Sequence, residues 1–228
     1  GRVMRVHKDG VTKGAGFLED YAAVALAALA LYELTFEAQW LERARAVGDA
    51  MVRWFWDDTI GGFFDTAHDH ESLIARPREL TDNAVPAGNS LARELLLRLA
   101  ELFGRDEDRR RGQWVLETLG EPMLRYPIAF GHALGAAELA VHGALEVAIV
   151  GAAESEDFAA LAREAATRYL PSLVLAGGAS GEIPLLLGKT TLSGAAAGYV
   201  CHNYQCDAPA TDPRAFGEKL DGAADGLG

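Results

Sequence analysis

A chain of 228 residues, half of them apolar, is long enough to bury a hydrophobic core, which excludes a largely disordered protein. Its 33 acidic residues outnumber 21 basic ones, a net charge of −12 that nucleic acid or an anionic membrane would repel. No apolar run reaches the roughly 18 residues that span a bilayer, and no signal segment is recognised. We therefore expect a cytoplasmic protein without nucleic-acid or membrane partners.

Apolar residues recur at helical spacing over much of the first 143 residues. Segment 17–36 is apolar on almost every side, which predicts an inner helix covered all round. Segment 38–55 carries apolar residues on one stripe and charged residues on the other, which is typical of an outer helix. A polar stretch follows at 56–80, where 62–66 is either a short strand or an ordered loop. Further helices are predicted at 90–103, after the break at 104–106, and at 127–142.

The pattern changes at residue 144. Segment 145–150 is predicted as a buried strand, 158–169 as a helix and 172–176 as a second strand, which together resemble a β-α-β unit. A strand at 198–201, a short helix at 213–220 and a disordered tail at 221–228 follow. We therefore expect two regions, helical hairpins over 1–143 and a small α/β element with a cysteine-containing tail over 144–220 packed on them.

Alternating covered and half-exposed helices are what an α/α toroid needs, because its inner helices touch neighbours all round. The predicted fold is therefore mainly α, a partial toroid of helical hairpins. Ligands in such rings lie at the ends of inner helices, so we consider the polar and aromatic residues there. Asp20, Asp82 and His132 are the catalytic candidates, as acid and base about a sugar ring. The substrate-binding candidates are Glu19, Tyr21, Trp56, Phe63, Asp65, Asn83 and Asn89.

Two of the catalytic candidates also have a purely structural interpretation. Asp20 and Asp82 are suited to cap helices, accepting backbone N–H bonds without doing chemistry. The stretch from Asp82 to Asn89 contains a proline and a glycine that fix a tight backbone before an apolar helix. It is either a well-capped helix start or the wall of a sugar-sized pocket, with Phe64 or the aromatic candidates as stacking surface.

Metal and cofactor sites are not expected. His68 and His70 lie in a polar loop without a third ligand at a recognisable spacing, which favours solvated histidines. The segment after Gly151 lacks the glycines of a dinucleotide site. Cys201 and Cys206 have four residues between them, unlike the two of thioredoxin-type motifs and most zinc knuckles. They are interpreted as small buried residues on a turn, as a reversible disulfide or, last, as metal ligands.

Several motifs together resemble one known family. They are Gly16-Phe-Leu-Glu-Asp-Tyr-Ala22, Gly61-Gly-Phe-Phe-Asp-Thr66, Arg76-Pro77, Asp82 to Asn89, Arg125-Tyr-Pro127, Val147-Ala-Ile-Val-Gly151, and Tyr199-Val-Cys201 with Cys206 and Pro209. In these motifs the chain resembles the C-terminal region of the thioredoxin-domain-containing proteins related to spermatogenesis-associated protein 20. The resemblance implies part of an (α/α)6 toroid, similar to N-acylglucosamine 2-epimerase and six-hairpin glycosidases, in a protein that also carries a thioredoxin-like domain.

The resemblance leaves two functional hypotheses. One is a sugar-modifying toroid, epimerase-like or glycosidase-like, that binds a sugar-like small molecule. The other is a non-catalytic scaffold or redox-regulated docking module for the thioredoxin-like domain, with Cys201 and Cys206 as its thiol pair. In both, the apolar helices would meet the missing half of the ring or a second copy. The chain departs from the family at Ala87, where serine is expected, and at His202, where arginine is usual.

Overall fold

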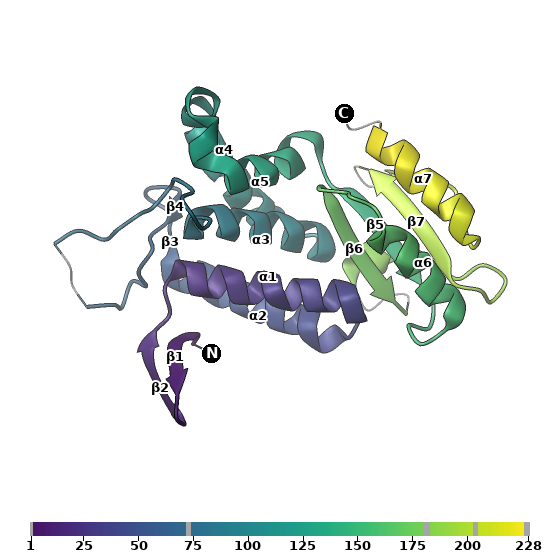
Figure 1. Cartoon of the computed structure of the whole chain (residues 1–228), viewed down its shortest axis with the longest axis horizontal. Helices are drawn as coiled ribbons and strands as arrows, with labels where there is room; N and C mark the ends of the chain where they lie inside the picture. The colour runs from purple at the N-terminus through teal and green to yellow at the C-terminus, as the bar shows by residue number, and fades with distance from the viewer. Residues whose placement is uncertain (1, 72–73, 180–182, 203–204, 226–228) are drawn as a thin grey trace. The chain divides into compact units, whose positions relative to one another are not determined.

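The structure is a computed structural model that describes residues 2–71, 74–179, 183–202 and 205–225 (Figure 1). The chain divides into two compact units. The first unit comprises Gly1–Leu99 and Asp106–Ala137, and the second comprises Ala100–Arg105 and Glu138–Gly228. Each unit is described by itself below.

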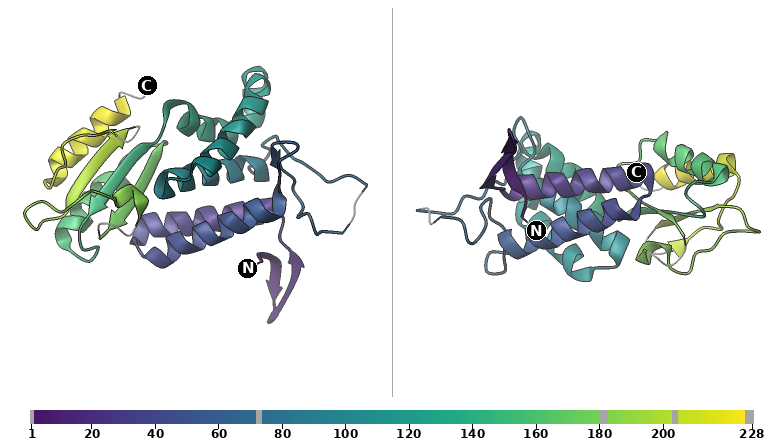
Figure 2. Two further views of the ribbon diagram at one scale, coloured as in Figure 1. Left: turned by 180° about the vertical axis from the view of Figure 1, so that it is seen from behind. Right: turned by 90° about the horizontal axis from the view of Figure 1, so that it is seen from below.

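Helices form most of the first unit, at the positions that the apolar spacing predicts. α1 and α2 lie side by side as a hairpin (Figures 1 and 2). α1 ends where Phe36 takes a left-handed conformation, with φ 55°, and donates its N–H to the Tyr32 carbonyl. The helices are α1 (Leu18–Thr35), α2 (Ala38–Phe55), α3 (Gly88–Phe103), α4 (Asp106–Arg125), the short 3-10 helix η1 (Pro127–Phe130) and α5 (Gly131–His142).

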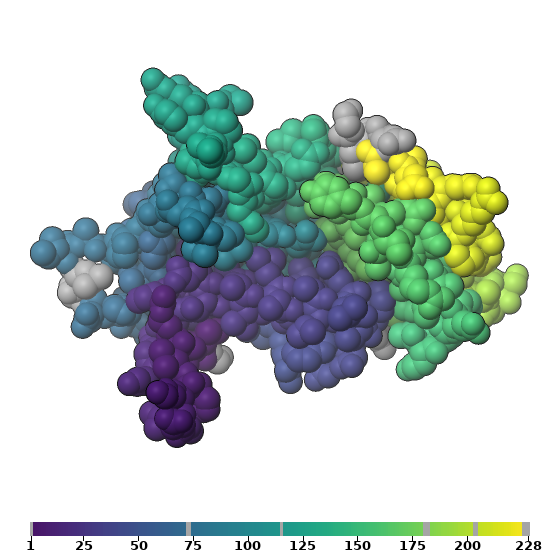
Figure 3. Space-filling model, viewed as in Figure 1, coloured from purple at the N-terminus to yellow at the C-terminus, as the bar shows by residue number. Residues whose placement is uncertain are grey.

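In the described part of the chain, α1 is apolar all round but covered on one side only. Its buried face packs on α2, where Tyr21 meets the Phe55 ring edge-on with centroids 5.0 Å apart. The opposite face is apolar and exposed, and Figure 3 shows α1 at the surface along its length. That face consists of Ala23, Val24, Ala27, Ala30, Leu31 and Leu34. The covering on all sides that we expected for an inner helix is therefore found on one side.

Two short hairpins flank the α1–α2 pair. β1 (Met4–Lys8) and β2 (Val11–Ala15) are antiparallel and joined by Asp9 and Gly10, whose φ angles of 51° and 75° suit a two-residue hairpin turn. Our sequence predictions contain no strand here. β3 (Trp56–Asp57) pairs with β4 (Gly62–Phe63), so a short strand lies within the predicted strand or ordered loop at 62–66.

A four-stranded sheet organises the second unit, in the order β6-β5-β7-β8. β5 is parallel to β6 and antiparallel to β7, which confirms the predicted β-α-β unit and the strand at 198–201. The elements are β5 (Leu145–Val150), α6 (Glu156–Ala166), β6 (Leu173–Gly178), the 3-10 helix η2 (Pro184–Leu186), β7 (Ala197–His202), β8 (Gln205–Cys206) and α7 (Pro213–Asp225).

Neighbouring residues of β7 contact different elements on the two faces of this sheet. Gly198 faces α7 so closely that a Cβ atom there would lie 2.5 Å from the Phe216 ring. Successive side chains of a strand alternate between faces. Tyr199 therefore points to the other face, where its hydroxyl donates to the Thr190 carbonyl at 2.7 Å and accepts from the Thr190 N–H at 3.0 Å. The segment around Thr190 thus packs against the face of β7 that α7 leaves free.

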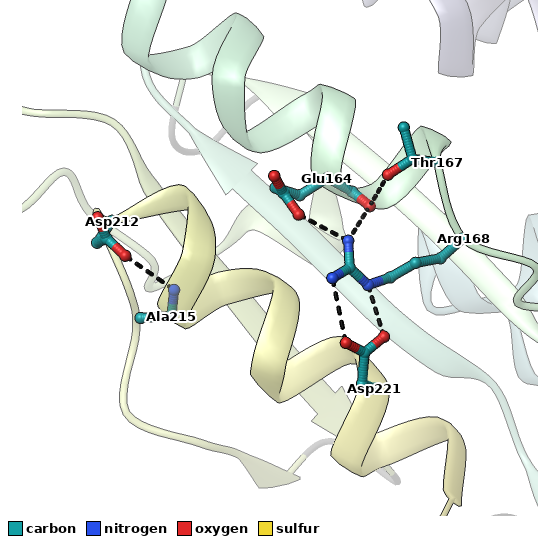
Figure 4. A network of polar contacts seen from close by, with 6 residues as sticks. All are labelled: Glu164, Thr167, Arg168, Asp212, Ala215 and Asp221. Carbon is teal, nitrogen blue, oxygen red and sulfur yellow. Dashed lines mark hydrogen bonds and ion pairs between the residues drawn. The ribbon is translucent and has the colours of Figure 1, made fainter.

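Arg168 fastens α7 to the chain that follows α6 (Figure 4). Its guanidinium donates to both Asp221 oxygens, at 2.7 and 3.1 Å, and to the Glu164 carboxylate at 2.7 Å. This forked geometry is the one that arginine forms best with carboxylates. We expected the helix to end at 220 and a disordered tail to begin at 221, but α7 continues to Asp225 because Asp221 is held in place. Residues 226–228 lie outside the described chain.

The chain is mostly helical with a small mixed sheet, as expected, and the toroid stays a prediction. None of the described helices combines the length and apolarity that crossing a bilayer requires.

We predict that Gly198→Ala destabilises the protein by about 1–3 kcal/mol, because the added methyl group must displace the Phe216 ring from a packed interface. Gly222→Ala is the matched control, since a Cβ there meets nothing within 4 Å and α7 gains about 0.5–1 kcal/mol from the better helix former. Urea unfolding followed by circular dichroism measures both. Equal effects of the two substitutions would contradict the packing described for β7.

Candidate functional site

A cavity of about 180 Å³ lies in the first unit, beside the N-terminal ends of α1 and α3. Three carboxylates, two prolines and one aromatic ring take part in its wall. Among the described lining residues there is no lysine or arginine. The lining consists of Phe17, Glu19, Asp65, Thr66, Pro77, Glu79, Thr81, Asn83, Val85, Pro86, Ala87 and Gly88.

Backbone hydrogen bonds fix Asp65 at this cavity from both sides. Its carbonyl accepts the Leu18 N–H, one of the unpaired donors at the start of α1, at 2.9 Å. Its own N–H donates to the Pro77 carbonyl at 2.9 Å, and its carboxylate accepts the Glu79 N–H at 2.8 Å. The loop that carries Asp65 and Glu79 is therefore tied to a helix end rather than free.

The start of α3 completes the frame. A Cβ atom on Gly88 would lie 3.0 Å from the Glu19 nitrogen, so the two helix starts approach as closely as they do only because this residue is glycine. Asn89 is fully buried, and its amide donates to the carbonyls of Phe63 at 3.3 Å and Glu79 at 3.0 Å. The proline and glycine of the 82–89 motif thus position the cavity wall.

Two carboxyl groups of the cavity have pKa values shifted in opposite directions. Burial raises the pKa of Asp65, and the nearby charges of Glu79 and Glu19 add to the rise against the opposing Glu79 N–H bond and the Arg78 charge. The hydroxyl and N–H of Thr81 donate to Glu79 and lower its pKa. The two carboxyl groups therefore lie in different environments, a partly buried one for Asp65 and a hydrogen-bonded one for Glu79.

The amino-acid sequence relates this chain to known proteins. No family model matches it. Human spermatogenesis-associated protein 20 is 34% identical over 206 residues, which cover 87% of this chain and 26% of the human protein. The rat protein of the same name is 32% identical with the same coverage. An uncharacterized protein of Caenorhabditis elegans is 25% identical over 197 residues, covering 85% of this chain and 27% of that protein.

The chain is homologous to spermatogenesis-associated protein 20. It spans about a quarter of the length of the curated relatives it matches. The region of the relatives to which it corresponds stays a prediction, as does the activity of the complete proteins.

Three of the seven predicted substrate-binding residues line the cavity, namely Glu19, Asp65 and Asn83. The other four have structural contacts. Tyr21 and Phe63 are buried in the core, and Asn89 holds the loop. Trp56 donates its indole N–H to Asp58 at 2.7 Å and packs on Phe63 and Trp114. In this homologue of spermatogenesis-associated protein 20, the aromatic candidates therefore form hydrophobic contacts away from the cavity lining.

Asp82 and Asp20, two of the three catalytic candidates, cap helices. One Asp82 oxygen accepts the N–H groups of His132 and Ala133 at the start of α5, at 2.9 and 3.0 Å, and the other accepts the Ala87 N–H at 2.9 Å. Burial alone would raise the pKa of Asp82, but these hydrogen bonds lower it overall. Asp20 accepts the Phe17 N–H at 2.8 Å at the start of α1. These contacts match the capping interpretation.

The third candidate, His132, pairs with Glu94, its Nε2 lying 2.9 Å from a carboxylate oxygen. This contact raises the pKa of His132 against the effect of burial. Arg93 is fully buried close by, where burial lowers its pKa to about 10 and the charge of Asp82 opposes the shift. His132, Asp82 and Arg93 are thus neighbours around the start of α5, and none of them is among the residues that line the cavity.

Phe17, Glu79 and Thr81 line the cavity and were missed by sequence reasoning. The signal for Glu79 and Thr81 is weak, because both lie in a loop without periodicity. In the same loop, His68 stacks on Trp54 with centroids 4.8 Å apart. Within the described residues, no group of three or more histidine, cysteine or acidic side chains is placed to hold a metal ion.

Cys201 and Cys206 form a disulfide between β7 and β8 in the second unit. A reversible disulfide was the second of the three interpretations of their spacing; the structure shows the bond, and its reversibility stays a prediction. Cys201 is 2% exposed, whereas Cys206 is exposed to solvent. The two sulfurs therefore differ in their access to other molecules.

We predict that Asp82→Ala lowers the free energy of unfolding by about 1–2 kcal/mol, because the start of α5 loses its cap. The pKa of Asp82 is lowered by folding, so its contribution is present above the unfolded value and disappears as the pH falls through the folded one. Urea titrations at neutral pH and below about pH 3 should show the difference from wild type shrinking in acid. Glu117→Ala, an exposed site on α4, is the control and should stay within about 0.5 kcal/mol at both pH values.

Proposed function

We propose that the cavity beside Asp65 binds a neutral sugar and that Asp65 and Glu79 act on it as general acid and general base. The observation that carries the proposal is that two carboxyl groups with opposite pKa shifts line one small cavity. At about 180 Å³ the cavity is smaller than the roughly 300 Å³ at which sites for drug-sized ligands begin. A ligand of monosaccharide size fits this volume better than a nucleotide or a long peptide.

The chemistry of the wall supports a sugar. Carboxylates accept hydrogen bonds from hydroxyl groups, and the Asn83 amide and Thr81 hydroxyl can both donate and accept. Phe17 adds an apolar ring of the kind that packs on the C–H face of a sugar. With three carboxylates and no cation among the described lining residues, the cavity disfavours phosphorylated or carboxylated sugars.

An acid and a base at one site serve either reaction class suggested by the sequence. An epimerase-like reaction needs a base that removes a proton from carbon and an acid that returns one. A glycosidase-like reaction needs an acid that protonates the leaving oxygen and a carboxylate that assists attack at the sugar carbon. The substrate that turns over, a single sugar or a glycoside, distinguishes the two.

We further propose that the helical hairpins belong to an α/α toroid whose other hairpins cover the exposed face of α1. Two observations support this: the six exposed apolar residues of that face, and the match of this chain to only about a quarter of the length of its relatives. Apolar surface of that extent on a helix is expected to meet a partner. The rest of the ring is the partner we favour, and a second copy of the chain is the other.

The disulfide favours a second candidate function, a redox-regulated docking module. We infer a cytoplasmic location from the sequence, and in that compartment thiols are generally kept reduced. A disulfide there is one that forms and opens during function. The exposed sulfur of Cys206 gives a reductant access to the bond, while Cys201 stays buried.

We predict that calorimetric titration with a panel of neutral monosaccharides and disaccharides detects binding, and that Asp65→Asn weakens it at least tenfold. Glucuronic acid and glucose 6-phosphate should bind less tightly than glucose because the wall is acidic. Asp58→Asn, an exposed carboxylate outside the lining, is the matched control and should bind as wild type does. Binding of no neutral sugar in the panel would end the carbohydrate proposal.

The same variant has a stability readout that separates lost binding from lost folding. Because folding raises the pKa of Asp65, its ionised form destabilises the folded chain once the pH exceeds the unfolded value. Asp65→Asn removes that charge, so its melting temperature near neutral pH should equal or exceed that of wild type. A lower value would mean that the Asp65 carboxylate supports the fold rather than a reaction.

We predict that the chain by itself associates through α1 at micromolar concentrations, and that the double substitution Leu31→Lys and Leu34→Lys makes it monomeric. The added charges prevent burial of this face at a contact. Sedimentation velocity gives the readout. The control is Leu124→Lys with Ile128→Lys, two exposed apolar residues elsewhere in the first unit, which should leave association unchanged. A monodisperse wild-type monomer would contradict an uncovered docking face on α1.

A further inference from the structure

The second unit contains a cavity of about 260 Å³ that ends at the disulfide. One wall is the sheet, which contributes Glu146 from β5 and Cys206 from β8. The other walls come from the end of α3, from η2 and from the chain that follows it. The lining consists of Glu101, Gly104, Glu146, Pro184, Leu185, Leu187, Lys189 and Cys206.

Strand register places Glu146 directly beside the disulfide. Glu146 on β5 is the cross-strand partner of Cys201 on β7, and Cys201 is the partner of Cys206 on β8. Directly opposite residues of antiparallel strands point to the same face, with Cβ atoms about 4.5–5.5 Å apart. The carboxyl group and the two cysteines therefore form one row across three neighbouring strands, on the face that Tyr199 also occupies.

A carboxylate is an unusual residue at this position. Glu146 is 3% exposed in a strand whose other five residues are buried and apolar. Burying a charged group costs several kcal/mol unless other groups compensate for the lost water. What distinguishes Glu146 is its place in the sheet, directly across from Cys201.

Lys189 provides a positive charge on the same cavity. Burial lowers the pKa of Lys189, and the charge of Glu146 opposes that shift. The lysine is held in place, because its ammonium group donates to the Leu185 carbonyl at 2.8 Å and the following residue is bonded to Tyr199. The charged groups that line the cavity with Glu146 are thus Lys189 from this segment and Glu101 from α3.

We propose that Glu146 exchanges a proton with the buried sulfur of Cys201 when the Cys201–Cys206 disulfide forms and opens. The proposal rests on the redox-regulated candidate function and names the residue that would drive it. When the disulfide forms, a disulfide oxidant such as oxidised glutathione first exchanges with the exposed Cys206, which gives a mixed disulfide and releases one thiol of the oxidant. The Glu146 carboxylate takes the proton of the Cys201 thiol, and the resulting thiolate attacks the Cys206 sulfur of the mixed disulfide, so that the second thiol of the oxidant leaves and takes a proton from solvent. When the disulfide opens, the proton returns to the Cys201 thiolate.

The opening step needs a dithiol reductant. A thiolate of the reductant attacks the exposed Cys206 sulfur and forms a mixed disulfide, while the electron pair of the old bond leaves on Cys201. Glu146 gives that sulfur its proton and is left as the carboxylate that the closing step requires. The second thiol of the reductant then attacks its partner sulfur in the mixed disulfide and releases Cys206, so one dithiol is oxidised for each disulfide reduced.

The test follows native disulfide opening and closing in the full chain. Dithiothreitol is added near pH 7, samples are alkylated with iodoacetamide at intervals, and mass spectrometry counts the free thiols. Closing is then started with oxidised glutathione. Glu146→Gln should slow both steps at least tenfold near pH 7, within the range expected for loss of a general base. Near pH 9, where a thiol ionises without help, the closing rate of the variant should recover.

Glu101→Gln is the matched control, because it removes a carboxylate from the same cavity without touching the row of Glu146, Cys201 and Cys206. Its rates should stay within twofold of wild type. Equal slowing in both variants, or no recovery of Glu146→Gln at high pH, would reduce Glu146 to a structural or electrostatic role and overturn the proposal.

Two outcomes separate this proposal from the redox function on which it rests. A wild-type disulfide that dithiothreitol does not open in the folded chain overturns the redox function itself. A wild-type disulfide that opens readily, with Glu146→Gln opening and closing at the same rate, overturns the proton exchange alone. If Glu146→Gln fails to fold by circular dichroism, Glu146→Asp replaces it: its shorter side chain should slow closing near pH 7, and wild-type rates would contradict the proposal.

Discussion

The buried side-chain amide of Asn89 is the contact on which the first cavity depends. It donates to the carbonyls of Phe63 and Glu79, and so ties a strand and a loop to the first turn of α3. The loop that contains Asp65 and Glu79 has little regular structure of its own, and such segments are ordered only where their backbone groups find partners. The positions of both carboxyl groups therefore depend on Asn89, a residue that is not itself among those lining the cavity.

Hydrogen bonding distinguishes Asp82 from Asp65. Asp82 accepts three backbone N–H groups, and its pKa is lowered although burial acts in the opposite direction. Asp65 accepts one backbone N–H group with its carboxylate and lies near two other carboxylates, and its pKa is raised. Both residues lie beside helix starts, so this location alone does not identify a catalytic acid. The proposed role of Asp65 rests on that difference in environment rather than on its place beside a helix.

Periodicity in the sequence was sufficient for the helices and for the β-α-β unit, because each buries one continuous apolar face. The hairpin formed by β1 and β2 was not predicted, since all ten of its strand residues are exposed and only the turn at Asp9 and Gly10 signals it. Of the predicted substrate-binding residues, Glu19, Asp65 and Asn83 line one cavity, and their role there stays a prediction. Polar character at helix ends could not locate Glu79, whose position depends on the Asn89 amide, or show that the aromatic candidates are core residues.

Acidic residues at the surface of this chain differ in their energetics from the buried carboxylate in the centre of the sheet. Most of the net charge of −12 lies on surfaces where water screens it and where a single charge changes stability little. Glu146 is different, because strand alternation places it on the same face as the disulfide, where it is buried, and folding must compensate for its lost hydration. Lys189 supplies part of that compensation from a segment that the Tyr199 hydroxyl holds in place. The same hydrogen bonds that stabilise this face of the sheet therefore also hold the segment that carries Lys189 beside Glu146, the cross-strand partner of the buried Cys201.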